Sequence, residues 1–162
     1  MAAQTGASKK FYISTTTGEQ ANQAAYEALA WTEVEWVEAI GEFGDSTTPV
    51  NLILLGDARV QKFKGSSDAG TLQLTMAFKD DAYGSPLGGQ GLMLQANEDT
   101  TSTVYNFKVS FEDSTSSPLG HSTRYFGGQV GTFVESVPGA DEILRVNSEV
   151  RINTAIVRVN KT

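Results

Sequence analysis

The sequence contains no cysteine and only one histidine, His121, among 162 residues. The missing cysteines exclude disulfides, thiol nucleophiles and the zinc or iron-sulfur sites that thiolates build. Any catalytic triad or histidine-containing metal site in this chain would have to use this one histidine. The Gly/Ser-rich sequence around it instead favours a solvated position in a loop. We therefore expect no enzymatic activity, no cofactor and no metal site.

Basic residues and long apolar runs are also scarce. Twelve Lys and Arg stand against 19 Asp and Glu, giving a formal net charge of −7, which argues against a protein that grips DNA through clustered positive charge. The longest aliphatic run, residues 52–55, is far shorter than the roughly 20 residues that span a bilayer, and residues 1–10 have no apolar stretch of signal-peptide length. We expect synthesis in the cytoplasm and no membrane insertion.

The dominant pattern in the sequence is the alternation of strands. Residues 70–79, 103–111 and 144–153 each place apolar side chains on one parity and polar side chains on the other, as strands with one buried and one solvated face do. Several such strands indicate antiparallel pairing. The predicted fold is all-β, a sandwich or barrel of antiparallel strands, in one domain covering residues 1–162.

Two further segments are strand-like but less regular. Residues 31–44 are interpreted as one long strand of mixed faces after a short helix or loop, and a helix over 20–40 is the competing interpretation. Residues 124–137 include Gly127, Gly128 and Gly131, which in a strand mark bulges or close backbone approach.

One flanking helix is predicted over residues 85–96. Ser85 and Pro86 have the chemistry of an N-cap and a first helical position, and Leu87, Gly91 and Leu94 follow at helical spacing. The glycines in this segment cost about 1 kcal/mol each relative to alanine. Packing against the sheet must therefore hold the helix.

Acidic side chains occur in pairs at the predicted strand ends, at 80–81, 98–99, 112–113 and 141–142. None has the alternating spacing of a calcium loop, so solvated turns are favoured. The sequence does not show which carboxylates lie close together in the fold, and two that do could act as a catalytic pair. A small hydrolase is therefore kept as a remote hypothesis.

Two polar extended segments complete the chain: an N-terminal arm, 1–10, and a long connection, 44–64, that contains the apolar run 52–55. Exposed in a monomer, this run would favour aggregation. Two interpretations stay open: the run folds back as a strand, or it meets a neighbouring subunit.

The order of these segments resembles the major tail tube protein of long-tailed, siphovirus-like bacteriophages. The resemblance runs through the arm ending in Phe11-Tyr12-Ile13, the long strand, the extended connection, and the turn at 65–70 before a Leu-alternating strand. It continues through the helix, the strand 104–111, the aromatic-glycine strand 125–130 and the closing strand 143–152. It covers nearly the whole chain, and the helix-compatible segment 21–30 departs from it.

The resemblance implies a structural virion protein that assembles as hexameric rings, stacked into a tube through which phage DNA passes on ejection. It implies that the connection reaches the adjacent ring, that the arm contributes subunit contacts, and that tape-measure and tail terminator or tip proteins are partners. The inter-subunit candidates are Phe11, Phe43, Asp45, Val50, Leu52, Leu54 and Lys64. The channel-wall candidates are Glu33, Glu35, Gln73, Thr75, Asn106 and Lys108.

The net charge agrees with this role, because DNA must pass without being held and an acidic or neutral wall suits that better than a basic one. The alternative function is a stand-alone β-sandwich carbohydrate-binding module that uses Trp31 or Trp36 as a stacking surface.

Overall fold

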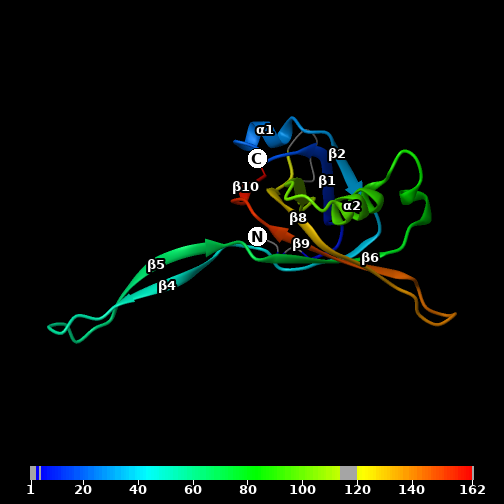
Figure 1. The fold of residues 1–162 in the computed structure, drawn as a ribbon. Helices are drawn as coiled ribbons and strands as arrows, with labels where there is room; N and C mark the ends of the chain where they lie inside the picture. Colours follow the sequence, from blue (N-terminus) through cyan, green and yellow to red (C-terminus); the bar gives the residue numbers. More distant parts are fainter. Residues whose placement is uncertain (1–2, 4, 114–119, 162) are drawn as a thin grey trace.

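The computed structural model describes residues 3, 5–113 and 120–161. Among these residues most of the elements are strands, and only one helix is longer than a turn or two (Figure 1). In chain order the elements are β1 (Lys10–Thr17), α1 (Gln23–Glu27), β2 (Trp31–Val34), β3 (Val37–Ile40), β4 (Ser46–Leu52), β5 (Gln61–Asp68), β6 (Thr71–Ala77), the 3₁₀ helix η1 (Asp80–Tyr83), α2 (Gly89–Glu98), β7 (Tyr105–Ser110), β8 (Thr123–Ser136), β9 (Arg145–Ile152) and β10 (Val157–Val159). The predicted all-β class is confirmed.

One antiparallel sheet forms the body of the protein. Its strand order is β2-β1-β7-β8-β9-β6-β3, and β10 pairs with β8. The first and last strands of this order, β2 and β3, follow each other directly in the chain, so the sheet curls round until its two edges come near each other. This curvature gives the body an inside and an outside, and the alternating strands direct their apolar side chains inward.

Aromatic and aliphatic side chains from nearly every strand fill the interior. Phe107 is fully buried, and its ring lies 5.7 Å from that of Phe11 and 5.8 Å from that of Phe126. Strands β6 and β9 contribute the alternate residues that the sequence pattern predicted to face inward, among them Leu72, Leu74, Met76, Val146 and Val150.

Helix α2 covers one side of the body, and its buried side chain Gln90 bonds it to the neighbouring segments. The Gln90 side-chain amide donates to the carbonyl oxygens of Glu35 and Ala77, both at 2.8 Å, and accepts from Lys79 N–H and the Tyr83 hydroxyl. Gly89 lets the helix approach β2 closely, because a Cβ there would lie 2.2 Å from the Glu33 carbonyl oxygen. The expectation that packing holds this glycine-rich helix is confirmed.

The structure corrects two predicted boundaries. The strand expected over 31–44 is two short strands, because Trp36 adopts a left-handed conformation with φ 57° and turns the chain between β2 and β3. The helix begins at Gly89 and not at Ser85, since the segment before it forms a loop in which the Ser85–Pro86 peptide bond is cis and Gly88 N–H donates to the Ala82 carbonyl.

The glycines of β8 have the roles that the sequence suggested. The pairing of β8 with β9 shifts register between Val130 and Thr132, a bulge that includes Gly131. At Gly128 a Cβ would lie 2.3 Å from the Arg151 carbonyl oxygen, so only glycine fits there without moving the neighbouring strand.

Candidate subunit-contact surfaces

The hairpin of β4 and β5 projects away from the body (Figure 1). Its two strands pair only with each other, from Ser46 opposite Asp68 to Leu52 opposite Gln61. Every residue of β4 is exposed. The connection expected over 44–64 is therefore an antiparallel hairpin, and the apolar run at its tip does not fold back onto the body.

The hairpin has one apolar face, which the described residues leave largely exposed. Val50 and Phe63 lie opposite each other and so share a face, on which Leu52 follows two residues further. Val50 is 54% exposed and Phe63 is 53% exposed, and Ile53, Leu54, Leu55 and Val60 extend the apolar surface around the tip. A two-stranded hairpin is marginally stable by itself in water, and a contiguous apolar patch on an exposed edge indicates a binding surface.

The charge of the hairpin differs from that of the rest of the chain. Residues 46–68 contain three basic side chains, Arg59, Lys62 and Lys64, and two acidic ones, Asp57 and Asp68, which gives a net charge of +1. Since the whole chain has −7, the remaining residues have −8. A second copy of this acidic chain is thus electrostatically suited to receive the hairpin.

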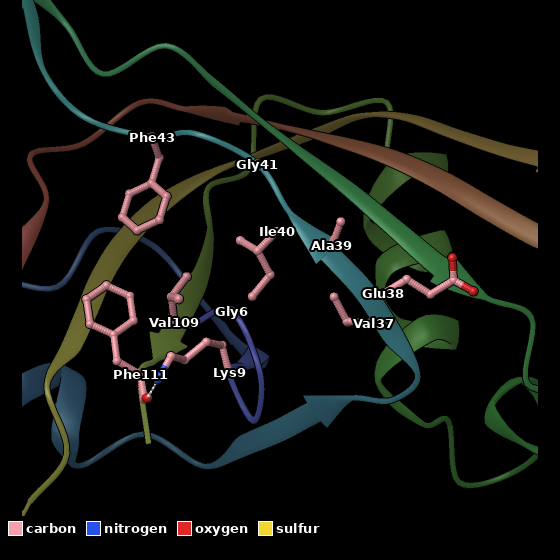
Figure 2. A pocket seen from close by; sticks show the side chains of 10 residues that line it. All are labelled: Gly6, Lys9, Val37, Glu38, Ala39, Ile40, Gly41, Phe43, Val109 and Phe111. Atoms are coloured by element: carbon pink, nitrogen blue, oxygen red, sulfur yellow. Dashed lines mark hydrogen bonds between the residues drawn. The ribbon is translucent and has the colours of Figure 1, made fainter. Parts of the chain in front are cut away.

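A groove opens in the body between β3 and β7. Figure 2 shows its lining, with a cavity volume of about 390 Å³. Ile40, Phe43, Val109 and Phe111 provide apolar walls, and Lys9 lies at the rim and donates from Nζ to the Phe111 carbonyl. The groove places Phe43 and the segment before β1 side by side.

The structure distributes the inter-subunit candidates over the interior and the surface. Phe11 is fully buried in the core, so its side chain is not available to a neighbour. Phe43 packs partly on the core, with its ring 6.0 Å from that of Phe126, and lines the groove. The others are exposed, Asp45 just before the hairpin and the rest on it: Val50, Leu52, Leu54 and Lys64.

A second surface is the outward face of β3, β6, β9 and the C-terminal half of β8, residues 129–136, which we call the polar sheet face. Side chains on it bond across the strands: Gln73 Nε2 donates to Glu149 Oε2 at 3.3 Å, and Thr75 Oγ1 donates to Asn147 Oδ1 at 3.2 Å. Both outer edges of these four strands lack a strand partner among the described residues, since β7 pairs with β8 only as far as Gly128.

The channel-wall candidates do not share one surface. Gln73 and Thr75 lie on the polar sheet face. Asn106 is fully buried, and its side-chain amide donates to the carbonyl oxygens of Thr16 and Gly18, both at 2.9 Å. Its side chain reaches no exposed face.

The three charged wall candidates lie on other parts of the body. Glu33 of β2 is exposed and lies 3.9 Å from Lys10, and Glu35 in the β2–β3 turn lies 3.4 Å from Lys79. Lys108 is half-buried, with its Nζ 4.1 Å from the centre of the Tyr12 ring, and burial lowers the pKa of this amine.

Sequence reasoning missed several residues of both surfaces. Phe63 and Val60 belong to the exposed apolar surface of the hairpin, and pairing the two halves of residues 46–68 as a hairpin would have found Phe63 opposite Val50. The polar parity of residues 145–151 was visible in the sequence, and it marks Asn147, Glu149 and Arg151 as neighbours of Gln73 and Thr75 on one face.

The two tryptophans considered as a stacking surface occupy different positions in the fold, Trp31 at the start of β2 and Trp36 in the turn after it. Trp31 packs 5.8 Å from the Tyr125 ring and its Nε1 donates to the Tyr26 carbonyl at 3.1 Å. Trp36, 58% exposed, lies at the β2–β3 turn.

His121 lies 2.9 Å from a Glu112 carboxylate oxygen, so the histidine expected in a solvated loop is engaged by a neighbouring acid. Within residues 3, 5–113 and 120–161, no group of three His, Asp or Glu side chains is placed to hold a metal ion. No helix in the described part of the chain is long and apolar enough to cross a membrane.

Neither a family model nor a curated protein matches this chain. Solved structures do. A chain of the anti-feeding prophage (AFP) baseplate superposes with a TM-score of 0.63 at 12% identity, covering 98% of this chain and 98% of that one. A chain of the SPP1 tail tube gives 0.62 at 11% identity, covering 99% of this chain and 80% of that one.

A third similar structure is a chain of the sheath/tube terminator of PVC, an extracellular contractile injection system. It gives a TM-score of 0.61 at 8% identity, with 93% of each chain covered. At these identities the likeness shows the fold alone. The resemblance to tail tube proteins is thereby confirmed at the level of the fold.

Proposed function

We propose that this chain is the structural subunit of a bacteriophage tail tube, in which hexameric rings stack around a channel for DNA. The observation that carries the proposal is the β4–β5 hairpin, whose apolar face projects from the body and is left largely exposed by the described residues. The fold shared with a chain of the SPP1 tail tube supports the same role. The chain acts through assembly and not through catalysis.

The two free edges of the polar sheet face provide a route to a ring. Within the part of the chain that the structure describes, β3 has an unpaired outer edge, and residues 129–136 of β8 have another on the opposite side of the same four strands. Pairing β3 of one copy with β8 of the next is a head-to-tail contact, which closes into a ring when the rotation between copies permits. The polar sheet faces of all copies would then line one continuous inner wall.

The hairpin provides the contact along the tube axis. Its apolar face, formed by Val50, Leu52 and Phe63, becomes buried when it reaches a subunit of the adjacent ring, which removes the exposed patch that a monomer leaves in water. Its net positive charge favours an acidic neighbour and offsets part of the repulsion between copies that each have −7.

The remaining contacts complete the particle. The N-terminal arm, 1–10, adds to subunit contacts, and its residues Gly6 and Lys9 line the same groove as Phe43. Tape-measure and tail terminator or tip proteins bind the assembled tube in the virion, and DNA passes the lumen without specific binding. The subunit is made in the bacterial host before assembly.

Electron microscopy of the purified protein over a range of concentrations tests the proposal. We expect rings and stacked tubes with a central channel wide enough for duplex DNA. A protein that stays monomeric at every concentration, and is absent from tails of the phage particle, would contradict it.

A pair of double variants separates the hairpin contact from ring formation. V50S/F63S removes the apolar face, and we expect single rings that no longer stack. N51S/K62Q changes the opposite face of the same hairpin and should still give tubes. Tubes of normal length from V50S/F63S would overturn the role given to the hairpin.

A further inference from the structure

The polar sheet face is electrically balanced although the chain is acidic. Its outward charged side chains are Glu38 of β3, and Arg145, Glu149 and Arg151 of β9. Two positive and two negative groups give a net charge of zero on this face, against −7 for the chain. Glu135, also within these strands, lies opposite the buried Val146 and so points to the other side of the sheet.

Each arginine of this face is paired with one of its glutamates. Arg145 Nε donates to Glu38 Oε2 at 2.8 Å, which joins β9 to β3 across β6. Arg151 Nε donates to Glu149 Oε1 at 3.1 Å, and the second oxygen of Glu149 accepts from Gln73. Each carboxylate occupies the Nε donor of its arginine and places a negative charge beside the guanidinium, which offsets the positive charge that would otherwise be offered to phosphate.

The glycine in β8 makes room for one of these pairs. A Cβ on Gly131 would lie 2.6 Å from Arg151 Nε. The guanidinium therefore rests over the neighbouring strand, within reach of Glu149, and does not project straight outward.

We propose that Glu38 and Glu149 mask Arg145 and Arg151, so that the polar sheet face offers the phosphate backbone of DNA no net positive surface. This inference rests on the proposed function, in which that face lines the channel. Every unmasked arginine would recur in each subunit of each ring, and such repeated phosphate contacts would accumulate into strong retention of DNA. The arginines in turn keep the wall from becoming acidic enough to oppose the entry of DNA.

The test compares two double variants with the same net charge. E38Q/E149Q frees both arginines, whereas E19Q/E27Q removes two exposed carboxylates just before and within α1. The probe is a short fluorescent duplex DNA, titrated with the purified free chain at several salt concentrations. We expect E38Q/E149Q to bind, with log K falling against log salt by a slope of about −2, while the control stays as weak as wild type.

The charge-reversed pair E38K/E149K, with E19K/E27K as its control, enlarges the same contrast. Thermal unfolding of each variant checks that the chain is intact. Equal DNA binding by each variant and its control would overturn the proposal.

This experiment uses the free chain and does not depend on ring assembly. Rings without a difference in DNA binding would leave the proposed function standing and refute the masking. A difference in binding without rings would support the masking and refute the tube.

Discussion

The body and the β4–β5 hairpin differ in how their apolar side chains are buried. In the body, strands from both ends of the sequence bury a shared core around Phe107. In the hairpin, two neighbouring strands bond only to each other, and Phe63 is 53% exposed. The body carries the interactions that fold the chain, and the hairpin carries apolar surface that only another molecule can bury.

Two matched phenylalanine substitutions give the largest contrast. Phe107→Ala leaves a cavity between Phe11 and Phe126, and we expect a loss of about 3 to 5 kcal/mol in the free energy of unfolding. Phe63→Ala should change it by less than about 0.5 kcal/mol in the free chain. Urea denaturation measures both. Equal losses at the two positions would show that the hairpin is part of the cooperative core.

A second comparison sets a buried glutamine against an exposed one. Gln90→Leu leaves Lys79 N–H and the carbonyls of Glu35 and Ala77 without their buried partner, which we expect to cost about 2 to 3 kcal/mol. Gln73→Leu, on the exposed polar sheet face, should cost less than about 1 kcal/mol. Thermal unfolding compares them, and a stable Gln90→Leu variant would mean that α2 is held by its apolar contacts alone.

The smallest expected effect is a pH dependence at the end of α2. Asp99 accepts from Thr101 Oγ1 at 2.6 Å and Thr101 N–H at 2.8 Å, and from the Tyr105 hydroxyl at 2.7 Å, and these bonds lower the pKa of its carboxyl. A carboxyl whose pKa is lower in the folded than in the unfolded state stabilises the fold at pH values above its unfolded-state pKa of about 3.9. This stabilisation is lost as the pH falls through the pKa of the folded state.

Asp99→Asn should therefore flatten the decline of the unfolding midpoint below about pH 4. Exposed Glu98→Gln is the neighbouring control. An unchanged acid profile in Asp99→Asn would show that other carboxylates dominate the acid response.

The sequence predicted the body better than it predicted the hairpin. Alternation identified β6 and β9 because each has one buried and one solvated face, and it also identified β7, although the polar side of β7 is covered in the fold. The hairpin escaped because both of its faces are exposed in the single chain, so residues 46–52 need no strict alternation. In the proposed tube, the apolar residues of the hairpin would instead be explained by contact with a neighbouring subunit.

The sequence predicted the exposure of some channel-wall candidates correctly and of others wrongly, because alternation shows only which side of a strand a residue lies on. Parity correctly separates Gln73 and Thr75 from the core, and it also assigns Asn106 to the polar side of its strand. The alternation does not show what covers the polar side of this strand. In the fold, Thr16 near the end of β1 and Gly18 just after it cover Asn106 and accept hydrogen bonds from its side chain. Which outward faces stay open depends on contacts between residues far apart in the chain.

Hydrogen–deuterium exchange of the hairpin amides, measured in the free chain and in assembled tubes, tests the central claim most directly. We expect residues 46–68 to exchange quickly in the free chain and to become strongly protected in tubes, while the amides of β8 and β9 that pair with each other are protected in both. Hairpin amides already protected in the free chain, or unprotected in tubes, would contradict the account.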